Sequence, residues 1–370
     1  MGTLRLILAL AVVVDHAPQQ FSIRIAPGDV AVEMFFMISG FYMALILSTR
    51  YSTKSVMGIS AFYLARFLRL WPAYAITAAF LYSWLALVPL VTGHPSMGPF
   101  VTPPRSSVWQ ALIGLSNLTM IGQDVLTLFH VTPHGDVTLT FGAPAVLDDG
   151  SQSLGYARIV GQAWSIGAEI WFYLLVPLLI RLNSLFLTVL LVASLALRVL
   201  LGEYFNLTIY FFFPAQLSLF LAGILAYRWR DVMIVEGQAF AFGGLSILIV
   251  LVASFQILLS SSDNEKWILY FLLFLFMPTI FEEFQSNAVD RGIGELSYPI
   301  YITHRGIFAI VGGVWMKFFG TLPPGSLMLM LVVGSASVLY FTVDAPVDRL
   351  RHRLVRNWIR ARVSSPTSRR

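Results

Sequence analysis

Long apolar runs, separated by shorter polar stretches, make up most of this 370-residue chain. A run of about 20 apolar residues is long enough for one helix to cross the hydrocarbon core of a membrane. The pattern therefore predicts an all-α integral membrane protein. Eleven apolar segments are candidates for its helices: residues 3–17, 30–48, 72–91, 109–129, 164–181, 185–201, 207–227, 239–260, 266–281, 297–317 and 325–345.

Basic residues between these segments indicate which ends lie in the cytoplasm, because cytoplasmic flanks carry an excess of Lys and Arg. The arginine-rich stretch 348–370 is therefore placed inside, and counting backwards puts residues 181 and 228–230 inside too. If segment 109–129 crossed the membrane, the basic stretch 50–69 would be forced outside. We therefore expect about ten transmembrane helices, both termini in the cytoplasm, and one re-entrant or interfacial helix at 109–129.

Composition excludes several classes of protein. Hydrophobic residues make up 57% of the chain and charged residues only 12%, with a mean hydropathy of +0.77, whereas soluble domains are about 25% charged. The basic character is concentrated in residues 348–370, which we expect to touch anionic lipid rather than nucleic acid. The chain has no cysteine, which excludes disulfides and thiolate catalysis. We expect one membrane domain, residues 1–347, followed by a basic cytoplasmic tail.

One segment between the predicted spans is unusually long. Residues 92–163 are rich in Pro and Gly and lie outside the membrane in this topology. Loops of this length are uncommon unless they have a function, and we expect a lid over an outward-facing cleft. Its histidines, His94, His130 and His134, would bind a metal only if the loop brought them together, and we expect no metal site.

The first predicted span carries ionisable residues at both ends of its apolar run. Arg5 and His16 are eleven positions apart, which returns them to nearly the same helix face, with Asp15 beside the histidine. Titratable groups within a membrane usually face a protein interior or a watery cavity and mark function. The simpler alternative is that Arg5 anchors the helix in the cytoplasm and that His16 lies at the interface.

A second polar cluster opens the fifth apolar segment, which begins at Trp164 with the letters WSIGAEIWFY. Ser165, Glu169 and Tyr173 repeat every four residues along one helix face. A carboxylate in an apolar helix is costly unless it is paired, and the imidazole of His16 would be a natural partner. The two would form a general base with an orienting carboxylate; the alternative is a packing role for Glu169 alone.

Two arginines precede the third apolar segment, in FYLARFLRLWPAY. Arg66 and Arg69 are three apart on a predicted short helix that ends before Pro72, so their guanidinium groups share one face. Such a pair can hold phosphate groups in a bidentate manner. Ordinary cytoplasmic anchoring explains the same spacing and remains an alternative.

Two other spans carry polar groups. Glu33 lies in the outer part of the second segment, and Ser39 with Gly40 lies near its middle. Small residues there allow another backbone or a ligand to approach closely, although in membrane helices they more often serve packing alone. His304 lies near the middle of the tenth segment, behind Pro299 in ELSYPIYITH.

Taken in order, these motifs resemble those of the membrane-bound acyltransferase 3 family. The resemblance runs from Arg5 to about Pro346 and rests on the spacing R-x10-H followed by FFMISGF, RFLRLWP, AWSIGAEIWFY and ELSYPIYITH. It implies O-acylation, usually acetylation, of an extracytoplasmic glycan or glycolipid, with cytoplasmic acetyl-CoA as the donor. It also implies a location in the bacterial inner membrane.

The resemblance implies roles for particular residues as well. His16 matches the essential histidine, Arg5 its upstream partner, and Glu169 the acid of the WSxxxE stretch. Asp344 stands where many members have Glu before the last proline. The candidates for donor binding are Arg66, Arg69, Ser39 and Tyr74. The candidates for binding the acceptor substrate are Trp164, Ser165, Tyr173, Glu33, Asp15 and His304.

Two chemical routes and a second class of function stay open from the sequence. His16 would either deprotonate the acceptor hydroxyl or carry the acyl group itself. The other class is a transporter or flippase of a lipid-linked saccharide, in which buried ions form a proton relay. The expected partners are acyl-CoA, a glycan or lipid-linked saccharide, and membrane lipid. The pattern determines neither the acceptor nor the oligomeric state, and a homodimer remains open.

Overall fold

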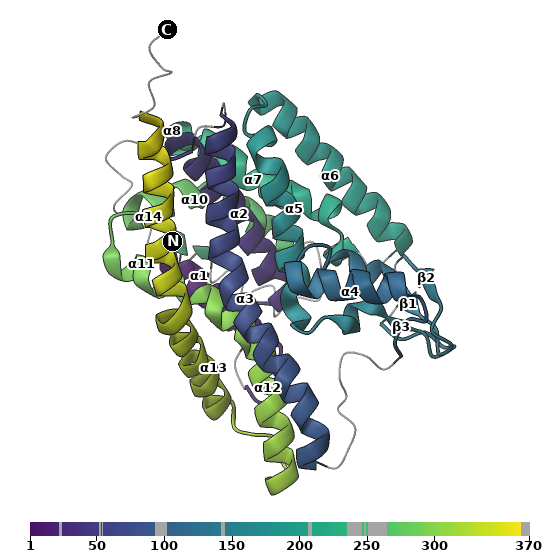
Figure 1. The fold of residues 1–370 in the computed structure, drawn as a ribbon. Coiled ribbons are helices and arrows are strands. Elements are labelled where there is room, and N and C mark those ends of the chain that lie inside the picture. The colour runs from purple at the N-terminus through teal and green to yellow at the C-terminus, as the bar shows by residue number, and fades with distance from the viewer. Residues whose placement is uncertain are drawn as a thin grey trace.

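The computed structural model consists mostly of helices, with long helices in a bundle and a smaller lobe beside them (Figure 1). The structure describes residues 1–21, 24–51, 53, 55–92, 102–141, 145–205, 209–234, 246–247, 249–250 and 265–363. The apolar segment predicted at 239–260 falls almost wholly outside these residues, so that predicted span is not tested.

Six of the described helices are long and apolar enough to cross a membrane. They are α2 (Gly28–Thr49), α3 (Val56–Thr92), α5 (Trp164–Leu179, preceded by the 3-10 turn Gly161–Ala163), α6 (Ser184–Phe205), α10 (Glu265–Phe284) and α13 (Gly325–Leu339), which continues through a π-helical turn (Tyr340–Asp344) into α14 (Ala345–Val363). Three more helices coincide with predicted spans but are shorter or more polar: α1 (Gly2–Asp15), α7 (Phe213–Arg228) and α12 (Ser297–Phe319). An α-helical membrane protein is confirmed, whereas a count of ten spans is not.

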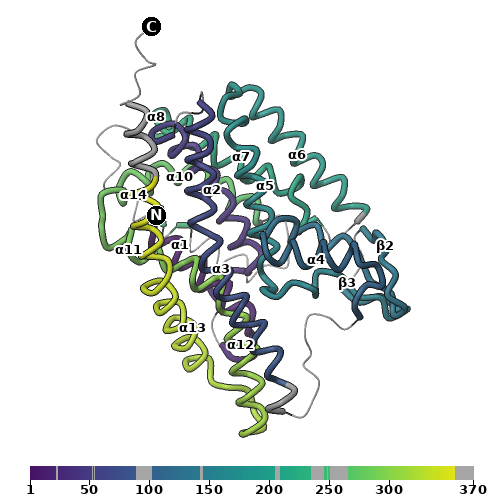
Figure 2. Tube along the Cα trace, viewed as in Figure 1, coloured from purple at the N-terminus to yellow at the C-terminus, as the bar shows by residue number. Residues whose placement is uncertain are grey.

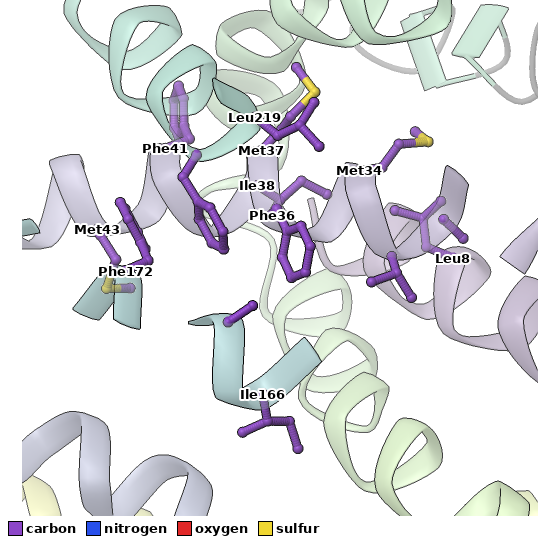
Figure 3. Close-up of a cluster of buried hydrophobic side chains, with 14 of the residues drawn as sticks. Leu8, Met34, Phe36, Met37, Ile38, Phe41, Met43, Ile166, Phe172 and Leu219 are labelled. Atoms are coloured by element: carbon purple, nitrogen blue, oxygen red, sulfur yellow. The ribbon is translucent and has the colours of Figure 1, made fainter. Parts of the chain in front are cut away.

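Helix α2 lies at the centre of the bundle. Within its most apolar stretch 72% of the residues are buried, against only 11% for α6, which leaves α6 at the lipid-facing edge. Figure 3 shows apolar side chains leaving α2 on several sides, towards Leu8 of α1, Leu219 of α7, and Ile166 and Phe172 of α5. A helix that is apolar all round is expected in this position, because every face meets another helix.

Two glycines allow α2 and α7 to cross almost in contact. A Cβ atom added at Gly40 would lie 2.1 Å from the carbonyl oxygen of Phe220, and one added at Gly223 would lie 2.0 Å from that of Met37. Close backbone approach through small residues is a principal source of helix association in membranes. The prediction that Gly40 permits such an approach is confirmed, and its partner is a helix backbone.

Helix α3 differs from its prediction. It runs unbroken for 37 residues, so Arg66 and Arg69 lie inside a long helix and not on a short one that ends before Pro72. A proline in a helix interior removes one backbone hydrogen bond, and in membrane helices neighbouring groups satisfy the carbonyl that is freed. The proline therefore does not end the helix here.

The described part of the segment 92–163 forms the smaller lobe. It contains α4 (Ser107–Thr119), the 3-10 turns Val125–Leu128 and Leu154–Ala157, and a three-stranded antiparallel sheet ordered β2 (Val137–Leu139), β1 (Phe129–Val131), β3 (Gln152–Ser153). The small sheet departs from the all-α prediction. Helix α4 lies across the direction of the long helices (Figure 1). With 13 residues it spans about 20 Å, too little to cross a hydrocarbon core of about 30 Å.

The topology predicts where a reporter fused to this lobe will be active. A periplasmic reporter inserted after Gly150, in the exposed turn before β3, should be active, because both flanking spans would deliver the lobe to the outer face. A fusion after Arg230, at the start of the short helix α8 (Arg230–Met233), is the matched control and should be active only with a cytoplasmic reporter. Cytoplasmic activity at Gly150 would show that the segment 109–129 does cross.

The start of α1 is held by α11 (Ala288–Glu295), as the position of the N-terminus in Figure 2 shows. The Asp290 carboxylate accepts hydrogen bonds from the backbone amides of Gly2 and Thr3, both at 2.7 Å, and from the Thr3 hydroxyl at 2.8 Å. Burial alone would raise the pKa of Asp290, but these hydrogen bonds hold it below its ordinary value. Asp290 therefore acts as a helix N-cap supplied from a distant part of the chain.

Candidate functional site

A cavity of about 1030 Å³ opens between α1, α2, α3, α5, α11, α12 and the α13–α14 run. Its volume is at the upper end of the range for sites that hold an organic ligand. Charged and titratable side chains occupy much of its wall: Arg5, Arg50, Arg66, Arg69, Glu169, Asp290, Arg291, Glu295, Asp344, Asp348, Arg349, Arg351 and His352. Seven of these are arginines and five are acids, so the wall has an excess of positive charge and suits an anionic ligand.

The two arginines of α3 both line this cavity, but in different states. Arg69 donates from Nη1 to Oε2 of Glu295 at 2.7 Å. Arg66 has no ion pair with any described residue, and its Nε atom is buried without a hydrogen-bond partner. Its guanidinium lies 5.9 Å and 6.0 Å from the ring centroids of Phe62 and Tyr173. Arg66 is therefore a cation that is held by aromatic rings and still lacks an anion.

Glu295 lies on the wall at the end of α11. Burial would raise the pKa of its carboxyl group, but the charges of Arg69 and, next, Arg5 hold that pKa below its ordinary value. The carboxylate therefore stays ionised in the cavity and neutralises Arg69. Arg5 lines the same wall one turn into α1, but His16 does not line the cavity, so the two residues that were predicted to share a helix face do not meet this cavity together.

Glu169 points into the cavity from α5. Its Oε1 atom accepts hydrogen bonds from the hydroxyl of Ser39 at 2.7 Å and from that of Tyr173 at 2.5 Å. The helical spacing of Glu169 and Tyr173 allows the second bond, and Ser39 reaches the same carboxylate from α2. His16 is not among the partners of Glu169, so the expected pairing of these two residues is wrong.

His16 has a different partner, His304 of α12. The two ring centroids are 5.0 Å apart, and neither ring lines the cavity. Nδ1 of His16 donates to the carbonyl of Val12 at 2.8 Å, and Nδ1 of His304 to that of Tyr301 at 2.7 Å. Each bond leaves the Nε2 atom of its ring as the acceptor, and Nε2 of His304 is buried without a partner.

A short chain of hydrogen bonds separates the cavity from this histidine pair. The hydroxyls of Ser165 and Tyr301 are 2.6 Å apart, and both lie on the cavity wall. Each hydroxyl has one proton, so one of the two donates to the other and its partner donates to the carbonyl of Gln162, which lies 3.1 Å from the Ser165 oxygen and 3.2 Å from the Tyr301 oxygen. His304 follows Tyr301 by three residues on α12, so the histidine pair begins one helical turn beyond the cavity wall.

Glu33, an expected acceptor-binding residue, lies in a closed polar network. Oε1 accepts from Nη2 of Arg198 at 2.6 Å and from Nε2 of Gln216 at 3.1 Å, while Oε2 accepts from the hydroxyl of Tyr270. These partners come from α6, α7 and α10, and Glu33 is only 2% exposed. A carboxylate this well satisfied stabilises the contact of four helices and has no oxygen left for a substrate.

Three other expected site residues also lie away from the cavity. The hydroxyl of Tyr74 donates to the carbonyl of Asn117 at 2.7 Å, so Tyr74 connects α3 to the smaller lobe and does not line the cavity. Trp164 is buried against the rings of Phe36, Tyr210 and Phe211. Asp15 forms an ion pair with Arg24 in the loop that follows α1.

Several residues of the site were not found from the sequence. Glu295 neutralises an arginine that lies 226 positions earlier in the chain, and no local spacing reveals such a contact. Asp344 was noticed only as a departure from the family pattern, yet it lines the cavity with a buried, unpartnered Oδ2 atom. A π-helical turn places it there, and such turns are frequent at functional sites.

Comparison with known proteins identifies the family of this chain. The model of the acyltransferase 3 family, described as an acyltransferase domain, matches residues 2–343. An uncharacterized protein of Aquifex aeolicus is 29% identical over 216 residues, which cover 52% of this chain and 90% of that protein. The O-acetyltransferase OatA of Staphylococcus aureus is 22% identical over 94% of this chain, which spans only 56% of OatA. No solved structure matches the chain significantly. With nearly its whole length matched, the chain belongs to the acyltransferase 3 family.

Proposed function

We propose that this protein transfers an acyl group, acetyl in the simplest case, from acetyl-CoA to a hydroxyl of an extracytoplasmic glycan or glycolipid. The family and the O-acetyltransferase relative support acyl transfer. The observation that carries the proposal is the arginine-rich cavity, which ends at Ser165 and Tyr301, one helical turn short of two histidines. Acetyl-CoA, which is rich in phosphate, would enter this cavity from the cytoplasmic side. The acceptor would approach the histidines from the opposite, outer side.

The donor end of the cavity is assigned to Arg66. Its guanidinium lacks an anion and is the natural contact for a phosphate of the donor. Arg69 is already neutralised by Glu295, so its part is to keep that region of the wall ordered. Ser39 and Glu169 line the path from these arginines towards Ser165.

The reaction itself is assigned to His16. Its Nε2 atom accepts the proton of the acceptor hydroxyl as the oxygen attacks the thioester carbonyl; the carbon–sulfur bond breaks, and the thiolate leaves with a proton. In the other route, Nε2 attacks the thioester carbonyl, the carbon–sulfur bond breaks and the thiol leaves; the acyl group then passes from Nε2 to the acceptor hydroxyl, whose proton goes to the ring. Rapid quenching of protein with labelled acetyl-CoA and no acceptor distinguishes the routes, because only the second leaves label on histidine.

The proposal is tested with the purified chain in detergent. Acetyl-CoA should bind, and it should be hydrolysed slowly when no acceptor is present. Mass spectrometry of surface glycans from a deletion strain should show the loss of an acyl group. A transporter or flippase would neither bind nor hydrolyse acetyl-CoA. That result would overturn the proposed acyl transfer and favour transport.

Removal of the unpaired donor-side cation should weaken donor binding. Arg66→Ala is expected to raise the Kd for acetyl-CoA by about tenfold or more, because a charge-assisted contact contributes about 1.5–3 kcal/mol. Arg66→Lys should restore only part of the affinity, since an ammonium lacks the bidentate fork. Arg353→Ala, an exposed arginine of α14 that does not line the cavity, is the control. Unchanged donor affinity in Arg66→Ala would reduce Arg66 to a topological anchor.

A further inference from the structure

Two arginine side chains meet at Gly161, close to the histidine pair. Nε of Arg158 donates to the carbonyl of Gly161 at 3.1 Å. The guanidinium of Arg305 lies against the same residue, because a Cβ atom added at Gly161 would be 3.3 Å from its Nη1 and 3.4 Å from its Cζ. The glycine leaves room for one guanidinium and its carbonyl holds the other, so the two cations are neighbours.

Neither cation has an anionic partner among the described residues. Arg305 is exposed and forms no hydrogen bond or ion pair there, while the Nη1 atom of Arg158 donates to the carbonyl of Gln123 at 3.0 Å. Burial, and next the positive charge of Arg305, lower the pKa of Arg158 to about 10. The acid that acts on Arg158 is Asp124, whose own pKa burial raises to about 6, and it forms no ion pair with the arginine.

The position of this pair relates it to the proposed reaction. Arg305 follows His304 directly, and its charge acts on both His16 and His304. In the proposed topology these residues lie towards the outer face, where the positive-inside rule gives no reason for an arginine. Topological anchoring therefore does not explain Arg305, and two adjacent guanidiniums without a counter-ion form a fork suited to a carboxylate or phosphate.

We propose that Arg305 and Arg158 form an anion subsite that binds a carboxylate or phosphate group of the acceptor, beside the hydroxyl that His16 would deprotonate. This inference rests on the proposed function and narrows it, because it makes the acceptor an acidic saccharide and not a neutral one. A carboxylate and a phosphate each present a pair of negatively charged oxygens to the two guanidiniums. Separate saccharide probes, one carboxylated and one phosphorylated, distinguish the two groups.

The test measures binding of saccharide probes to the full chain in nanodiscs of phosphatidylcholine, which has no net charge, with no acyl-CoA present. Trigalacturonate and a phosphorylated galactotriose are compared with neutral galactotriose. We expect at least one acidic probe to bind about tenfold tighter than the neutral one. The preference should weaken as salt rises, because the subsite is partly exposed. Which acidic probe binds tighter identifies carboxylate or phosphate as the group recognised.

Variants connect the preference to Arg305, the more exposed of the two arginines. Arg305→Gln should abolish it, and Arg305→Lys should keep part of it. Arg105 is an exposed arginine elsewhere on the smaller lobe, and Arg105→Gln should leave the preference unchanged. Equal affinity for acidic and neutral probes, binding of none of the probes, or a preference that survives Arg305→Gln would overturn the subsite. Because no donor is present, these outcomes are independent of acetyl-CoA turnover, the measurement that decides the proposed function.

Discussion

Replacing His16 by alanine is expected to slow acyl transfer by about a hundredfold or more while donor affinity stays unchanged. The imidazole would be the base that takes the acceptor proton, and it does not line the cavity proposed for the donor. Both quantities can be measured on one preparation, with acetyl-CoA titration for affinity and product formation for rate. An active His16→Ala enzyme would remove His16 from the mechanism.

The partner of His16 is tested by double variants. His304→Gln, which leaves a polar side chain near the ring of His16, should also lower the rate, and the double variant with His16→Ala should be scarcely slower than His16→Ala alone. Residues that act as one unit are non-additive in this way. Glu169→Gln combined with His16→Ala should instead multiply the two losses, because Glu169 is bonded to Ser39 and Tyr173 and not to His16.

Placing a methyl group between α2 and α7 is expected to destabilise the bundle strongly. In Gly223→Ala the new Cβ would lie 2.0 Å from the carbonyl oxygen of Met37, so the helices must separate and lose the packing of the central helix. We expect a loss of about 3 kcal/mol or more, seen as a lower apparent Tm in detergent together with a loss of donor binding. Gly40→Ala, on the facing helix, should behave in the same way.

A matched control for this variant lies on α13. Gly334 also stands inside a membrane helix, but a Cβ atom there would meet nothing within 4 Å. Gly334→Ala should therefore be neutral or slightly stabilising, because alanine loses less backbone entropy on folding. Equal stability of Gly223→Ala and Gly334→Ala would mean that α2 and α7 do not cross as described.

Features confined to one helix were predicted well from the sequence. The spacing of Glu169 and Tyr173 is the helical repeat that allows their hydrogen bond. Glycine in the middle of α2 does allow a second backbone to approach. In each case the information is local, because helical periodicity alone determines which side chains share a face.

Contacts between distant segments could not be predicted, since apolar periodicity does not specify which helix meets which. Glu33 and Glu169 look alike in the sequence, each a single acid in an apolar span. The structure buries Glu33 against Arg198 and turns Glu169 into the cavity. The same limit explains why His16 was assigned to Glu169 and not to His304, which follows it by 288 residues.

The hydrogen bonds among Ser165, Tyr301 and Gln162 also have an electrical consequence. A bacterial membrane stores energy as a voltage worth about 2.3 kcal/mol per elementary charge per 100 mV. In the proposed topology the arginine-lined cavity, whose wall includes Ser165 and Tyr301, would admit cytoplasmic ions, so that voltage would fall mainly across the layer that holds these bonds and the two histidines. A proton that left His16 in the proposed reaction would therefore move within a concentrated electric field. Acyl transfer in intact cells should accordingly respond to the membrane voltage, whereas the same enzyme in detergent should not.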